Sequence, residues 1–150
     1  MSLDATIPDG GWCSWAESSQ AMRRYHDVEW GVPIVEDDAM FERICLEAFQ
    51  CGLSWSTILA RRERLREVFC NFDLEALARF STTDVDRLVA DRSIIRHRGK
   101  IEAVVTNARA CQRLHQEVGS LADHLWSFAP PVTMRPRNGK VPSTSPASHR

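Results

Sequence analysis

Apolar residues recur with a helical period along most of this chain, most clearly in the stretch 41–55. The apolar positions at its start are spaced i, i+3, i+4 and i+7, as on one face of an amphipathic helix. They are Phe41, Ile44, Cys45 and Ala48. Asp37 or Asp38 can cap the first free N–H groups, and Gly52 can adopt the positive φ that ends a helix. We therefore predict a central helix that ends in a tight turn.

Glu47 is a carboxylate among apolar neighbours on this helix, and Leu53 and Trp55 follow the turn directly. A carboxylate, an aliphatic tip and an indole therefore lie close together in the sequence. An acid beside a flat aromatic ring can hold a flat, hydrogen-bonding ligand such as a nucleobase. The alternative is a surface glutamate beside two core residues, because large apolar side chains are usually buried.

The same period predicts further helices, at about 18–25, 54–69, 74–80, 83–90, 97–117 and 121–128. The expected N-caps are Ser18 or Ser19, Ser54 or Ser56, Asp73, and Thr82 or Thr83. Residues 26–33 end in a Gly/Pro break and predict a loop, and Gly119 is expected to end the longest helix. No alternating strand pattern or hairpin turn signal is present in the sequence, so the fold class predicted is all-α.

The composition divides the chain into three parts. Residues 1–11 predict a flexible lead-in, and residues 12–129 predict one helical domain. Five of the seven prolines fall in residues 130–150, together with Ser, Thr, Asn and Gly, which predicts an extended tail. A chain of 150 residues is long enough to bury a core.

The overall composition indicates a soluble, reduced, cytoplasmic protein. Hydrophobic residues make up 43% and charged residues 26%, as is ordinary for a globular chain. No apolar window is long enough to predict a membrane span, and the first residues lack the pattern of a signal peptide. The cysteines number five and include no Cys-x-x-Cys pair, which argues against a disulfide framework.

Basic residues are concentrated in one part of a chain whose net charge is only −1. Seven of them lie between Arg87 and Arg113. The segment from about 83 to 108 predicts two helices joined by a tight hairpin, which can present N–H groups and cations to a phosphate. The alternative is an ordinary αα-hairpin with a solvated basic face.

Other kinds of site have weaker support in the sequence. Cys13 and His26 are plausible soft-metal ligands, but two ligands are half of a closed zinc site, and buried cysteine with surface histidine is the alternative. Neither a Gly-x-Ser-x-Gly motif nor a Gly-rich phosphate loop is present. Four of the five tryptophans fall in residues 12–55, as in a stacking pocket or a core.

Several motifs resemble the bacterial 3-methyladenine DNA glycosylase I family, collinearly from about residue 12 to 148. They are Cys13-Ser-Trp15, Tyr25-His-Asp-Val-Glu-Trp-Gly-Val-Pro33, Ile44-Cys-Leu-Glu47, Gln50-Cys-Gly-Leu-Ser-Trp55, Ile94-Ile-Arg-His-Arg-Gly-Lys-Ile101 and Leu125-Trp-Ser-Phe128. The resemblance implies an all-α helix-hairpin-helix glycosylase that hydrolyses the N-glycosidic bond of 3-methyladenine in base-excision repair. It implies alkylated double-stranded DNA as partner and free 3-methyladenine as product. We also expect no membrane association and a monomer.

The resemblance also implies roles for individual residues. Glu47 is implied as the catalytic carboxylate; with Tyr25 it would hydrogen-bond the flipped base. Trp55 would stack on that base, and Trp15 and Trp30 would wall the pocket. Because alkylation at N3 makes adenine cationic and a good leaving group, an anionic carboxylate and an indole suit this substrate.

The DNA-binding residues implied by the resemblance lie in the turn and in the hairpin. Leu53, after Gly52, would fill the gap that the flipped base leaves. The hairpin would grip the phosphate backbone through Ser93, Arg96, Arg98 and Lys100.

The sequence departs from the family pattern at its zinc site. The resemblance implies a structural zinc ion with a second histidine and a second cysteine in a later segment, and this chain carries only Cys13 and His26. The alternative function is therefore a shortened, catalytically weak relative that binds DNA or the free base without turnover. Loss of cover over the central helices would favour dimerisation.

Overall fold

The computed structural model describes residues 13–130, and this part of the chain contains helices and no strands, which confirms the all-α prediction. The lead-in and nearly all of the tail lie outside the described residues. The chain divides into two compact units between Trp30 and Gly31, unit 1 before this point and unit 2 after it. No helix among the described residues is long and apolar enough to cross a membrane.

Unit 1 contains a 3-10 helix, η1 (Ser14–Ser18), and the helix α1 (Gln20–Val28). Ser19 is the N-cap of α1, and its Oγ accepts a hydrogen bond of 3.1 Å from the Met22 N–H, as predicted. The prediction of a loop from His26 onward was wrong. The helix continues to Val28, and the Tyr25 carbonyl then accepts hydrogen bonds from the N–H groups of both Glu29 and Trp30.

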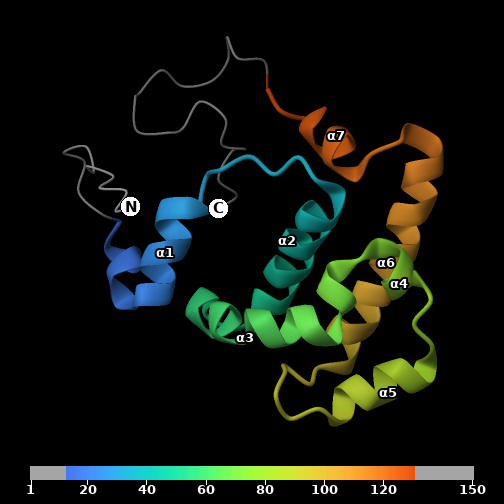
Figure 1. Ribbon diagram of the computed structural model, residues 1–150, viewed down its shortest axis with the longest axis horizontal. Helices are drawn as coiled ribbons and strands as arrows, with labels where there is room; N and C mark the ends of the chain where they lie inside the picture. Colours follow the sequence, from blue (N-terminus) through green and yellow to red (C-terminus); the bar gives the residue numbers. More distant parts are fainter. Residues whose placement is uncertain (1–12, 131–150) are drawn as a thin grey trace, which may run out of the picture. The chain divides into compact units, whose positions relative to one another are not determined.

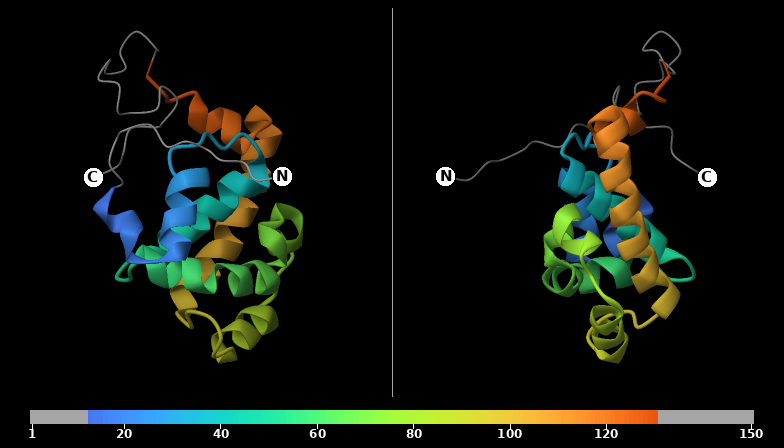
Figure 2. Two further views of the ribbon diagram at one scale, coloured as in Figure 1. Left: turned by 60° about the vertical axis from the view of Figure 1, so that its left-hand side comes forward. Right: turned by 90° about the vertical axis from the view of Figure 1, so that its right-hand side faces the viewer.

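Unit 2 is a bundle of helices arranged along its longest member (Figure 1). Its elements are α2 (Asp37–Gln50), α3 (Trp55–Val68), the 3-10 helix η2 (Cys70–Phe72), α4 (Leu74–Ala78), α5 (Thr82–Ala90), α6 (Arg98–Val118) and α7 (Leu121–Trp126). Helix α6 runs between α5 at one end of the unit and α7 at the other, in the views of both Figure 1 and Figure 2. Gly119, with φ of 92°, ends α6 where the sequence predicted the break.

The core of unit 2 forms where α2 meets its neighbours. Phe41 and Cys45 are buried as predicted, and burial raises the pKa of the Cys45 thiol well above its ordinary value. Ala48, which the periodicity also placed inside, is exposed, while Leu46 and Phe49 are almost completely buried. The reason is that α2 packs against α3, α6 and α7, so its buried surface is broader than a single stripe.

Local capping residues set most of the helix starts in unit 2. Ser54 caps α3 and Asp73 caps α4, both as predicted. The cap expected at Thr82 or Thr83 was one or two residues too late. Ser81 and Asp84 form a reciprocal capping box at α5, since each side chain accepts a hydrogen bond from the other residue's N–H.

The predicted cap of α2 was also wrong, for a reason that lies far along the chain. Glu36 is the N-cap residue, without a side-chain hydrogen bond. Asp37 instead accepts hydrogen bonds from Ser120 Oγ at 2.8 Å, Leu121 N at 3.0 Å and Ala122 N at 2.9 Å. Burial raises the pKa of Asp37, but these hydrogen bonds hold it below its ordinary value overall. Asp37 thus ties the start of α7 to the start of α2.

Candidate nucleobase and DNA-binding site

The predicted catalytic carboxylate lies in the last turn of α2. Glu47 is exposed and forms no hydrogen bond or ion pair with another residue of the range 13–130. Arg43 is one helical turn earlier on the same face, and its guanidinium carbon lies 5.7 Å from the centre of the Trp55 ring. Arg43 and Glu47 therefore share one face of α2, and Arg43 connects this face to Trp55 at the start of α3.

The turn between α2 and α3 holds Leu53 in a defined place. Gly52 has φ of 78° and stands in open space, where a side chain would be strained by the backbone alone. The Leu53 N–H donates a hydrogen bond of 2.7 Å to the Gln50 carbonyl, and Ser54 begins the next helix. The Leu53 side chain is 39% exposed and therefore accessible from outside the protein.

Lys100 reaches from the first turn of α6 to the last residues of α2. Its Nζ donates a hydrogen bond of 2.8 Å to the Phe49 carbonyl and one of 2.6 Å to the Cys51 carbonyl. A helix leaves its last carbonyls without partners and carries partial negative charge there, so a cation at this position is stabilising. The predicted DNA-binding residue Lys100 thus lies against protein carbonyls.

The predicted hairpin is formed by α5, residues 91–97 and α6. Asp91 accepts hydrogen bonds from the N–H and the hydroxyl of Ser93, and Arg64 on α3 donates to both Asp91 and Ser93. The hydroxyl and N–H of Ser93, with Arg64, lower the pKa of Asp91 to about 2. This network stabilises the turn that follows α5. The Ser93 side chain is hydrogen-bonded to Asp91 and Arg64.

The two predicted arginines of the hairpin differ in their surroundings. Arg98 pairs with Asp86 on α5 and with Glu102 on α6. Arg96 is exposed and has no hydrogen-bond or ion-pair partner among residues 13–130. Arg96 is consequently the better placed of the two to neutralise an external phosphate.

Unit 1 gathers the other predicted base-binding residues into one aromatic cluster. Trp15 lies at centroid distances of 6.2 Å from Tyr25 and 5.6 Å from Trp30. His26 stacks on Trp30 at 5.6 Å with an interplanar angle of 14°. These residues are separate in the sequence but are neighbours within this unit, because α1 packs against η1.

Cys13 and His26, the predicted metal ligands, are both half-buried in unit 1. His26 Nδ1 lies 3.0 Å from Asp27 Oδ1, and a carboxylate in this position can orient the ring of a metal-binding histidine. Between residues 13 and 130, however, no three His, Cys, Asp or Glu side chains are grouped closely enough to hold a metal ion. The described residues therefore do not fit a closed zinc site.

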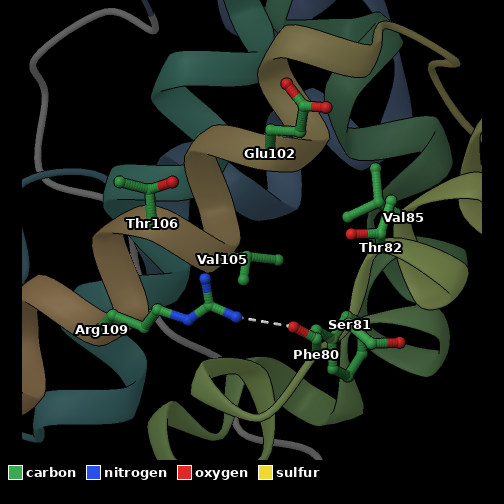
Figure 3. A pocket seen from close by; sticks show the side chains of 8 residues that line it. All are labelled: Phe80, Ser81, Thr82, Val85, Glu102, Val105, Thr106 and Arg109. Atoms are coloured by element: carbon green, nitrogen blue, oxygen red, sulfur yellow. Dashed lines mark hydrogen bonds between the residues drawn. The ribbon is translucent and has the colours of Figure 1, made fainter.

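A groove of about 370 Å³ lies elsewhere on unit 2, between the start of α5 and the outer face of α6 (Figure 3). Its lining residues are Phe80, Ser81, Thr82, Val85, Glu102, Val105, Thr106 and Arg109. Arg109 donates hydrogen bonds to the carbonyls of Ala78 at 3.0 Å and Phe80 at 2.7 Å, so it fastens α4 to α6. None of the predicted site residues lines this groove.

Sequence reasoning missed two residues that organise these features. Arg43 could have been found, because it stands four residues before Glu47 on one helix face. Arg64 could not, since nothing in the sequence links it to Asp91 and Ser93, 27 and 29 residues away.

Comparison with known proteins places these features in a known class. A sequence profile described as Methyladenine glycosylase matches residues 15–150. DNA-3-methyladenine glycosylase 1 of Escherichia coli (strain K12) is 43% identical over 139 residues, 91% of this chain and 74% of that protein.

Solved structures agree with the sequence comparison. A crystal structure of a 3-methyladenine DNA glycosylase I matches with a TM-score of 0.75 and 45% identity, over 83% of this chain and 66% of that one. A second, of such an enzyme in complex with 3-methyladenine, matches with a TM-score of 0.74 and 36% identity, over 77% and 62%. This chain thus spans somewhat less than two thirds of these two structures.

The all-helical fold is that of the solved DNA glycosylases it matches. More narrowly, the chain belongs to the methyladenine glycosylase family.

Proposed function

We propose that this chain hydrolyses the N-glycosidic bond of 3-methyladenine in alkylated double-stranded DNA, as a monofunctional glycosylase of base-excision repair. One observation carries the proposal: the Glu47 carboxylate is exposed and unpaired on the helix face where Arg43 contacts Trp55. The protein's relatives, named as enzymes of this activity, support it.

The substrate's charge explains why a carboxylate and an indole suit the reaction. In the damaged nucleotide the base carries the positive charge, and it leaves as neutral 3-methyladenine when the C1′–N9 bond breaks. Water adds to C1′, and a proton is released. Glu47 stabilises the positive charge that moves from the base to the sugar, and stacking on Trp55 contributes a cation–π attraction of about 1 kcal/mol.

Tyr25, Trp15 and Trp30 are proposed as further base-binding residues, on the basis of the family's motifs. Their support in this chain is that they form one aromatic cluster within unit 1. Aromatic side chains of this kind supply flat apolar surface, and the Tyr25 hydroxyl can hydrogen-bond a polar edge of the base.

DNA binding is proposed for the helix-hairpin-helix of α5 and α6 and for the turn at Gly52 and Leu53. Exposed Arg96 beside the N-terminus of α6 would neutralise a phosphate, and the Leu53 side chain would enter the gap left by the flipped base. The short turn favours this role, because a wedge must be held in place to keep the base out of the stack.

Zinc binding by Cys13 and His26 is the least supported of these proposals. The His26–Asp27 contact favours a ligand, whereas the described residues supply no third donor. No reaction step depends on zinc. Zinc content of the purified chain tests the proposal: we expect substoichiometric metal that falls further in Cys13→Ser.

The chain is proposed to be a cytoplasmic monomer. The five free cysteines support a reducing compartment. Sedimentation tests the oligomeric state, and a stable dimer would contradict the proposal.

Release of free 3-methyladenine from methylated duplex DNA tests the function directly. We expect release by the wild-type chain and its loss, by about a hundredfold or more, in Glu47→Gln, because the amide cannot stabilise a cation as a carboxylate does. Duplex affinity should stay nearly unchanged in this variant. Asp38→Asn is the matched control, since Asp38 is an exposed carboxylate on the same helix.

A folded wild-type chain that binds methylated DNA without releasing base would overturn the proposal. That result would establish the alternative, a relative that binds DNA or the free base without turnover. Equal release by wild type and Glu47→Gln would remove Glu47 from the chemistry.

A further inference from the structure

We propose that Lys100 is a positioning residue that fixes the Leu53 turn relative to the hairpin, rather than a phosphate contact. The inference rests on the proposed glycosylase function and assigns a coupling between two of its DNA-contacting parts. Both parts lie in unit 2.

Most of the hydrogen-bonding capacity of the Lys100 ammonium is used within the protein. Two of its three N–H donors already bind the carbonyls of Phe49 and Cys51, at 2.8 Å and 2.6 Å. Bonds from a cation to a carbonyl are roughly twice as strong as neutral ones. Moving Lys100 to a phosphate would break both bonds and leave carbonyls at the end of α2 without these donors.

Hydrogen bonds to the last carbonyls of α2 hold the turn that carries Leu53. The Ala48 carbonyl accepts from the Cys51 N–H, and the Gln50 carbonyl from the Leu53 N–H. Lys100 supplies the donors for the Phe49 and Cys51 carbonyls. Each of the backbone carbonyls 48–51 therefore has a hydrogen-bond donor. These hydrogen bonds also restrict the position of Leu53, because only Gly52 separates it from Cys51.

Lys100 is itself held at the start of α6. Its backbone N–H lies 3.3 Å from Nδ1 of His97, the N-cap of α6, so its main chain belongs to the first turn after the hairpin. In the neighbouring position, Arg98 joins α6 to α5 through Asp86. A phosphate held at the hairpin and a side chain inserted at Leu53 are therefore linked through one lysine.

Salt dependence separates positioning from phosphate contact. Each phosphate contact contributes about 0.9 to the slope of log affinity against log salt on duplex DNA. We expect Lys100→Met to leave this slope unchanged and Arg96→Met to reduce it by about one. Arg113→Met is the control for charge, since exposed Arg113 lies about 20 Å farther along α6 at 1.5 Å per residue.

Activity on duplex and on single-stranded DNA separates a defect in the insertion of Leu53 from a general loss of catalytic activity. We expect Lys100→Met to lower release from duplex DNA by about tenfold and release from single-stranded methylated DNA far less, because a single strand leaves no gap to fill. Lys100→Arg should recover most of the duplex activity, since a guanidinium can also donate to two carbonyls.

A double-mutant cycle tests the coupling itself. If Lys100 acts through Leu53, Lys100→Met should add little to the duplex defect of Leu53→Ala, whereas independent effects would multiply. Multiplicative effects, or a salt slope reduced by one in Lys100→Met, would overturn the proposal. Circular dichroism checks folding of each variant; if Lys100→Met does not fold, the cycle is run with Lys100→Gln, which retains one donor group.

Wild-type turnover distinguishes failure of this inference from failure of the proposed function. When the wild-type chain releases 3-methyladenine and the cycle is multiplicative, only the positioning role fails. When the wild-type chain releases none, the salt slopes still decide whether Lys100 contacts phosphate.

Discussion

Arg64 Nη2 on α3 donates a hydrogen bond of 2.8 Å to Asp91 Oδ2 at the end of α5, and Arg64 Nε donates to Ser93 Oγ at the same distance. One guanidinium therefore fastens the proposed phosphate-binding hairpin to the helix that begins with Trp55. Its third partner is Glu67, at 2.7 Å on its own helix. The hairpin is thus positioned from outside its own two helices.

The hairpin network should weaken only in strong acid. The pKa of Asp91 is about 2 in the folded chain, below its ordinary value of 3.8, so folding favours the ionised carboxylate. The stabilisation is complete above about pH 4 and is lost as the pH falls through about 2. Urea unfolding of wild type and Asp91→Asn at several pH values measures it as the difference in unfolding free energy.

We expect that difference to be nearly constant from pH 7 down to about pH 4 and to be mostly lost by about pH 2. Other acidic groups titrate equally in both proteins, so their effects cancel. A difference of the same size at pH 2 and pH 7 would show that the Asp91 carboxylate is not stabilised by its ionisation.

Leu53→Ala should impair excision from duplex DNA without impairing base binding. Truncating the side chain leaves the gap in the duplex unfilled, so we expect a fall in kcat/KM on the order of tenfold. Affinity for free 3-methyladenine should be unchanged. Leu53→Met conserves side-chain volume and should remain near wild type. An equal loss for duplex excision and free-base affinity would indicate a role for Leu53 in the base pocket instead.

Asp37→Ala should destabilise unit 2, although Asp37 is outside the proposed site. The change removes the acceptor of three hydrogen bonds and leaves the Leu121 and Ala122 N–H groups without it, so we expect a loss of about 2 kcal/mol in unfolding free energy. Asp38→Ala at the next, exposed position is the control and should change stability by less than about 0.5 kcal/mol. Thermal and urea unfolding compare the two.

The sequence was sufficient where structure depends on neighbouring residues. The caps at Ser54 and Asp73 and the break at Gly119 follow from interactions within four residues, so their patterns predict them. The family motifs indicated Glu47 and Trp55 as site residues, and their roles stay predictions.

The sequence was insufficient where a side chain bonds to a distant one. Asp37 looked like a cap for its own helix, but its partners are 83 to 85 residues later. Nothing in the sequence indicated that Lys100 would donate to backbone carbonyls 49 and 51 residues earlier. Only the fold supplies such partners.

The contact between Asp37 and α7 has a consequence for how unit 2 opens. A six-residue helix would ordinarily fray, and its amide protons would exchange with solvent quickly. The amides of Leu121 and Ala122 are instead held by a carboxylate 84 and 85 residues earlier, and the Trp126 indole N–H by the Ile34 carbonyl. Their exchange should therefore report the loss of the whole unit's packing, so that two amides near the end of the described chain serve as probes of its global opening.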